Sequence, residues 1–176
     1  MKRSCALMAM LLGLAWAQSA GYGVSGTVTY SASYTLGPWQ GKNTTASGQL
    51  SWDEGSGQMS GQVCLDLAAW DSGNALRDAD TRGKFEVRTY PQSCYTPTRL
   101  EGQPGGPATL VGLLDLHGVQ REVRIPGTLT RQGTGFSFTG TFATRFSDWN
   151  LEPPQFLFLS VDDALEVTVS GTATAH

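Results

Sequence analysis

The chain has 176 residues, with 12 Lys and Arg against 15 Asp and Glu and a formal net charge of −3 at pH 7. This mildly acidic balance argues against a nucleic-acid partner, because phosphate binding needs clustered Lys and Arg. The length suits one domain with a substantial core. Its 22 glycines, with frequent Ser, Thr and Val, favour strands and turns over helices.

The first twenty residues have the pattern of an export signal. Basic residues at 2–3 precede an uncharged, mostly apolar run over 5–14, which is followed by Ala-Trp-Ala at 15–17. A signal peptidase recognises this order of basic start, apolar stretch and small residues. The run is shorter than the roughly 20 apolar residues that span a bilayer, so we expect cleavage and no integral membrane segment afterwards.

Cleavage fixes the domain and its cysteines. A signal peptide of residues 1–17, with Ala20 as the alternative last residue, leaves 18–176 as one domain in the periplasm or secreted. Of the 3 cysteines, Cys64 and Cys94 then remain. In an oxidising compartment such a pair predicts one disulfide, and two buried free thiols are the alternative.

Alternation of apolar and polar residues predicts eight strands along the chain. They are expected at 24–34, 45–53, 59–67, 91–101, 107–117, 120–130, 136–142 and 165–170. Gly- and Pro-rich turn signals separate them, as at 103–107. The one helix expected is a short polar piece around 74–85, between the third and fourth strands.

Eight antiparallel strands with one apolar face close most simply into an up-and-down barrel, and a two-sheet sandwich is the alternative. A barrel of this size has room for one ligand. The same alternation is also what a filled barrel core would show. The residues alone leave a ligand cavity and a filled interior equally open.

Catalytic and metal chemistry find little support in the sequence. The two histidines are His117 and the terminal His176, and no cluster of His, Cys, Asp and Glu has the spacing of a zinc site. Asp115 shares a strand face with His117, but this histidine lies at a hairpin turn and is interpreted as structural. We therefore expect no enzyme activity, no metal and no cofactor.

Three segments resemble the motifs of a known family. They are the stretch from Asp71 through Arg77-Asp78 to Tyr90-Pro91, the hairpin 112–123 around His117-Gly118, and the loop 148–151 followed by 159–163. In this order they resemble the YceI-like family. Two departures stand out, because Asn150 occupies a position that is Gly in the family loop and the histidine common in early family strands is absent.

The resemblance implies an all-β fold, an eight-stranded antiparallel lipocalin-like extended barrel with one short helix between strands 3 and 4. It also implies export to the periplasm and a long cavity that in some members binds a polyisoprenoid or similar chain. The positions that match the family motifs residue by residue are Arg77, Asp78, His117, Gly118 and Asp148, and most of them are interpreted as structural. The resemblance favours a ligand cavity over a filled interior.

The expected function is that of an exported binding protein that holds an apolar chain, such as a polyisoprenoid, an isoprenoid quinone or a similar lipid, for transport, storage or stress response. The expected lining is Tyr30, Tyr34, Val63, Leu65, Leu67, Leu114, Phe136, Phe138, Phe142 and Val167, with Arg77, Asp78 and Trp149 at a polar mouth. The alternatives are a structural or stress-interaction module with a filled barrel and, third, a secreted hydrolase or isomerase. A homodimer stays open.

Overall fold

The structure, a computed structural model, describes residues 20–34, 37–153, 155–156 and 159–176. Within these ranges the side chains of Tyr34, 155–156 and 159–160 are outside the description. The expected signal peptide, residues 1–17, lies outside the described residues. The Tyr34 side chain, which was expected to line the cavity, is also outside the description.

The elements follow one another as strands, with helices after β3 and after β7. In chain order they are β1 (Ala20–Tyr34), β2 (Gly37–Trp52), β3 (Met59–Asp66), η1 (Leu67–Ala69), α1 (Ala75–Lys84), β4 (Gln92–Gly102), β5 (Gly106–Leu116), β6 (Val119–Gln132), β7 (Gly135–Arg145), η2 (Ser147–Trp149), β8 (Gln155–Phe156) and β9 (Leu159–Ala175). α1 lies between β3 and β4, as expected.

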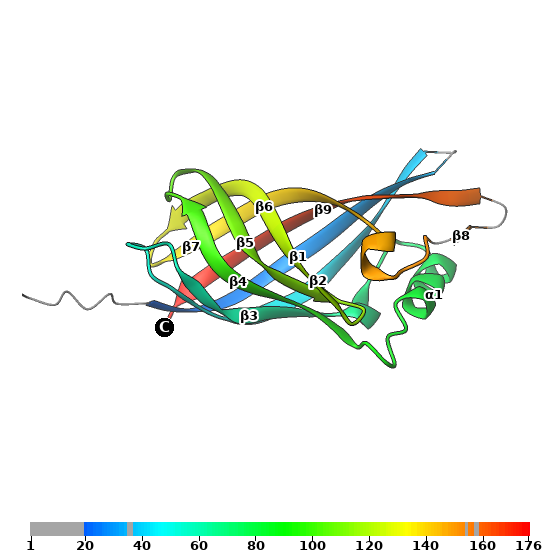
Figure 1. The fold of residues 1–176 in the computed structure, drawn as a ribbon, viewed down its shortest axis with the longest axis horizontal. Coiled ribbons are helices and arrows are strands. Elements are labelled where there is room, and N and C mark those ends of the chain that lie inside the picture. Colours follow the sequence, from blue (N-terminus) through cyan, green and yellow to red (C-terminus); the bar gives the residue numbers. More distant parts are fainter. Residues whose placement is uncertain (1–19, 35–36, 154, 157–158) are drawn as a thin grey trace, which may run out of the picture.

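Eight long strands form a closed antiparallel barrel, drawn out along one axis (Figure 1). Strands β1 to β7 pair in chain order, each with its successor up to the pair β6 and β7. Strand β7 then pairs with β9, and β9 pairs with β1, which closes the barrel. The two-residue β8 pairs with β9 alone. Because side chains alternate between the two faces of each strand, closure gathers one apolar set inside. The structure confirms the predicted barrel.

The seam between β1 and β9 joins the first and last strands of the barrel. It runs from the pair Tyr22 and Ala175 to the pair Tyr34 and Val161. Hydroxyl side chains face each other along its outer surface, as in Ser25 with Thr172 at 3.4 Å. This face is therefore polar, while the side chains of Tyr22 and Tyr30 are buried on the inner face.

The two ends of the barrel differ. At one end, the turn end, lie the short turns that join β2 to β3, β4 to β5 and β6 to β7, together with the C-terminus (Figure 1). At the other, the helix end, lie α1 and η2 (Figure 1). No helix among the described residues is long and apolar enough to span a membrane.

Strand β2 begins at Gly37, well before the expected start at residue 45. The early part was missed because Asn43, a polar residue, occupies an inward position and is fully buried. Its Nδ2 donates to the Asp66 carbonyl at 2.7 Å, and its Oδ1 accepts from the Thr45 backbone N–H at 3.0 Å and from the Thr45 hydroxyl. These bonds satisfy the buried amide and tie β2 to the end of β3.

Local contacts fix the connection from β3 to β4. Asn74 caps α1, with Oδ1 accepting from the backbone of Leu76 and Arg77 at 3.1 Å each. The predicted disulfide is present: Cys64 and Cys94 are directly opposite each other on β3 and β4 and are bonded. The bridge closes a loop with a sequence separation of 30, which contains η1 and α1.

Candidate functional site: an apolar cavity inside the barrel

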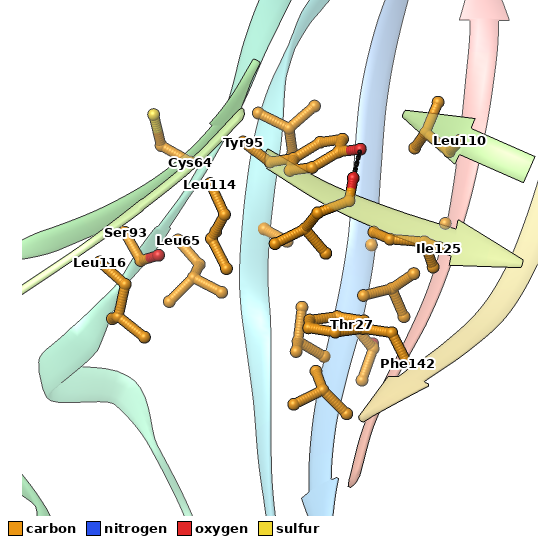
Figure 2. A pocket seen from close by; sticks show the side chains of 18 of the residues that line it. Thr27, Cys64, Leu65, Ser93, Tyr95, Leu110, Leu114, Leu116, Ile125 and Phe142 are labelled. Carbon is orange, nitrogen blue, oxygen red and sulfur yellow. Dashed lines mark hydrogen bonds between the residues drawn. The ribbon is translucent and has the colours of Figure 1, made fainter. Parts of the chain in front are cut away.

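A cavity of about 280 Å³ runs inside the barrel and is lined by residues of all eight long strands. Its volume is close to the lower end of the range typical of small-molecule sites, about 300–1,000 Å³. Figure 2 shows its middle, where Leu65, Leu114 and Phe142 come from three different strands. The lining is apolar because each strand turns its alternate aliphatic and aromatic residues inward.

Most of the side chains expected in the cavity line it in the structure. They are Tyr30, Val63, Leu65, Leu67, Leu114, Phe136, Phe138, Phe142 and Val167, together with Trp149. Trp149 is 2% exposed and donates from Nε1 to the Thr144 hydroxyl at 2.9 Å. Its indole therefore belongs to the packed wall at the helix end and does not form an open polar mouth.

Arg77 and Asp78 do not line the cavity, contrary to the expected polar mouth. The Arg77 guanidinium lies over the ring of Trp39, 4.7 Å from its centroid. Asp78 accepts hydrogen bonds from the backbone N–H and the hydroxyl of Ser72, at 2.9 and 2.6 Å. Both side chains thus hold α1 against β2 and the segment before it, in place of the ligand contact expected of them.

The turn end of the cavity is closed by packed aromatic rings. Phe136 contacts Tyr22 and Trp52 edge to face, with ring centroids 5.7 and 4.9 Å apart. The Arg131 guanidinium lies 4.6 Å from the Phe136 centroid and also pairs with Glu54 at 2.7 Å. These contacts form a plug whose outer layer is charged.

The helix end of the cavity reaches the surface beside α1. Lys84 and Glu152 both line the cavity there, and their side chains pair at 3.0 Å. The Glu152 side chain is 85% exposed and that of Lys84 is 29% exposed. A ligand could therefore enter between α1 and the segment after η2 with limited rearrangement of two surface side chains.

Tyr95 of β4 lies along the cavity wall, and its hydroxyl is bonded to β6, two strands away, by the bond drawn as a dashed line in Figure 2. Its hydroxyl donates to the Val123 carbonyl at 3.1 Å. Burial raises the pKa of Tyr95, so its phenol stays neutral. A Cβ atom on Gly112 would lie 2.9 Å from the Tyr95 ring, so only glycine leaves room for this ring.

His117 lies outside the cavity lining. It occupies the left-handed turn between β5 and β6, at φ 53°, and its ring packs on Tyr90 at 4.5 Å. Its Nδ1 is 3.3 Å from the Trp149 carbonyl, and its Nε2 is 3.7 Å from Glu86. The histidine therefore joins the hairpin to the two segments that cover the helix end.

Several residues that line the cavity were not predicted from the sequence. Trp39 lies in the part of β2 that was not expected to be a strand, and Trp70 follows η1 in a connector. Trp52 was detectable, because it alternates with Leu50 inside an expected strand. No group of three or more His, Cys, Asp and Glu that could hold a metal occurs in the described part of the chain.

Comparison with known proteins gives one family and several solved folds. The family model described as the YceI-like domain matches residues 23–173. The crystal structure of Burkholderia cenocepacia BcnA is similar, with 23% identity, a TM-score of 0.74 and coverage of 85% of this chain and 96% of that one. A search of curated proteins found no match.

Two further solved structures share the fold. A polyisoprenoid binding domain from Saccharophagus degradans, implicated in plant cell wall breakdown, has 17% identity and a TM-score of 0.71, covering 90% of this chain and 100% of that one. A Campylobacter jejuni YCEI protein has 15% identity and a TM-score of 0.63, covering 77% and 84%. At these identities the likeness establishes the barrel fold.

Proposed function

The chain belongs to the YceI-like family, and from this premise we propose that it is an exported binding protein that holds one apolar chain inside its barrel. The ligand class is a polyisoprenoid, an isoprenoid quinone or a similar lipid. The role is to carry or store that molecule, in ordinary transport or under stress, in the aqueous space outside the cytoplasm.

The observation that carries the proposal is the apolar cavity of about 280 Å³ inside the barrel. Apolar walls that lack packing partners destabilise a fold, by roughly 24 cal/mol per Å³ where a buried cavity stays empty. An apolar chain that fills it restores packing contacts and gains about 25 cal/mol for each Å² withdrawn from water. The solved fold described as a polyisoprenoid binding domain supports the same ligand class.

The two other function classes receive less support. A structural module with a filled barrel would not need a continuous cavity lined by all eight long strands. A hydrolase or isomerase would need converging titratable groups. Lys84 and Glu152, the Lys and the carboxylate among the described lining residues, pair with each other at the rim.

Native mass spectrometry tests the binding proposal. Protein purified without detergent is measured before and after organic extraction, and the extracted protein is then incubated with geranylgeraniol. We expect a lipid-sized adduct in the first sample, its loss on extraction, and uptake of one prenol per barrel. A protein that carries no apolar molecule at any of these stages would contradict the proposal.

The intact mass of protein recovered from outside the cytoplasm tests export separately. Cleavage after Ala17 or Ala20 predicts a mature chain that begins at Gln18 or Gly21. Either product retains Tyr22, the first residue of the seam with β9. Recovery of the uncleaved chain in the cytoplasm alone would contradict this part of the proposal.

A further inference from the structure

Three polar side chains at the helix end of the cavity have no hydrogen-bond partner. They are the indole nitrogens of Trp39 and Trp70 and the hydroxyl of Thr81. These residues are 8%, 8% and 3% exposed, and all three line the cavity. Each buried donor left unpaired costs about 1–3 kcal/mol. All three residues neighbour Tyr30, and such a group of unpaired atoms is unusual for a native fold and calls for a partner.

The surrounding contacts hold both indoles in place. Tyr30 packs edge to face on Trp39 and on Trp70, with centroids 5.3 and 4.9 Å away. Arg77 lies over Trp39 at 4.7 Å. The backbone of Asp71, next to Trp70, exchanges two hydrogen bonds with Lys42 of β2, at 2.8 and 2.9 Å. Donors fixed in this way lose little freedom when an acceptor arrives.

The chemistry of these groups selects an acceptor. An indole N–H can only donate, and a threonine hydroxyl can donate or accept. Burial raises the pKa of Tyr30 to about 12, so the neighbouring phenol also stays neutral. The Thr81 hydroxyl lies beside that phenol without a hydrogen bond of good geometry between them.

The charges at this end disfavour an anion. Lys84 is the cation among the described lining residues, and Glu152 already neutralises it at 3.0 Å. The Arg77 guanidinium stacks on Trp39 but does not line the cavity. A phosphate placed among the indoles would therefore be buried with no free cation in the described lining to pair with it, which is costly. A neutral oxygen can accept a hydrogen bond from these donors without that cost.

We propose that Trp39, Trp70 and Thr81 form a polar subsite that binds an uncharged carbonyl or ether oxygen at the end of the apolar chain. The inference rests on the proposed function of the barrel and specifies the ligand's head group. The ligand then lies with its oxygen at the helix end, near the surface opening, and with its tail toward the aromatic plug at the turn end.

Trp52 provides a matched control at the opposite end of the cavity. Its indole nitrogen is also unpaired, the residue is 5% exposed, and it lines the cavity beside Phe136. The Trp52 indole is the one unpaired donor at the turn end among the described residues. Trp→Phe at this position removes the same chemical group as in Trp39 and Trp70 without touching the subsite.

The experiment uses three probes that share a farnesyl tail and end in a methyl ketone, a hydrocarbon or a monophosphate. Their affinities are measured by displacement of a fluorescent apolar dye from the wild type and from Trp39→Phe, Trp70→Phe, Thr81→Val and Trp52→Phe. The wild type should bind the ketone about tenfold more tightly than the hydrocarbon, the value of one or two net hydrogen bonds. The first three variants should reduce this ratio at least threefold, and Trp52→Phe should preserve it.

The ratio is taken within each variant, so a change in fold stability or total affinity cancels. Equal affinity for ketone and hydrocarbon in the wild type would mean that water serves the donors, and it would overturn the subsite while leaving chain binding intact. Loss of the ratio in Trp52→Phe alone, or tightest binding of the monophosphate, would also overturn it. Failure of every probe to bind would instead reject the proposed function.

Discussion

Filling the middle of the cavity should separate stability from ligand binding. Leu114 lies on β5, and its side chain lines the cavity (Figure 2). In Leu114→Trp the larger ring enters empty space and fills roughly 60 Å³, worth about 1.4 kcal/mol at about 24 cal/mol per Å³. For a domain of this size, that raises the melting temperature by about 3–6 °C.

Bound ligand should make the wild type more stable than Leu114→Trp. Geranylgeraniol at a hundred times its dissociation constant adds about 2.7 kcal/mol to the stability of the wild type by mass action. This corresponds to a rise of about 5–11 °C. The melting temperature of Leu114→Trp should not rise with the prenol, because the new ring occupies the space of the ligand. Thermal unfolding followed by circular dichroism, with and without the prenol, should therefore show the variant as more stable alone and the wild type as more stable with ligand.

Leu113→Trp is the control, because Leu113 precedes Leu114 on the same strand and does not line the cavity. This variant should keep the full response to the prenol. A gain in stability of Leu114→Trp from the prenol, or an equal loss of the gain in Leu113→Trp, would show that the ligand does not occupy this part of the cavity.

Three further predictions concern the fold itself. Removing the Cys64–Cys94 bridge, by replacing both residues with Ala, should lower the free energy of unfolding by about 3–4 kcal/mol in urea titrations, because the unfolded chain gains the freedom of an open loop. Asn43→Ala should cost about 2–3 kcal/mol by leaving buried groups unpaired, and Thr44→Ala at the exposed neighbour should cost under about 0.5 kcal/mol. The pKa of Tyr30 is about 12 in the fold against an ordinary value of 10.0, so stability should be complete below pH 10 and fall by about 2–3 kcal/mol as pH rises to 12. Tyr30→Phe should remove that share of the alkaline loss, and an unchanged pH profile would contradict the assignment.

The period-two pattern was sufficient for the barrel and most of its lining. Phe136, Phe138 and Phe142 face the cavity because side chains two residues apart lie on the same face of a strand, and the other face of β7 is exposed to solvent. The turn residues likewise separated the strands correctly. Closure of the barrel was predicted from the count of strands and from the family resemblance. The β1–β9 pairing confirms the closure, and the family model confirms the resemblance.

The helix end was less predictable because long-range contacts determine it. Arg77 and Asp78 stand next to each other on a polar helix, and the sequence does not reveal that one covers Trp39 while the other holds Ser72. Trp39 and Asn43 lie where an inward polar residue hides the strand pattern. The positions of side chains at this end depend on contacts with residues distant in the sequence, and the alternation of apolar and polar residues does not predict such contacts.

The seam between β1 and β9 determines the order in which the barrel can be assembled. Tyr22 pairs with Ala175, and the N–H of His176 donates to the Gly21 carbonyl at 3.2 Å. Contacts between such distant parts of a chain form slowly, and they cannot form before β9 has been synthesised. Until then the apolar lining is open to solvent as a curved sheet with two free edges, which is an aggregation hazard. A chain that crosses a membrane unfolded would postpone this hazard to the far side, so barrel closure becomes the step at which a chaperone, or the ligand itself, has most to protect.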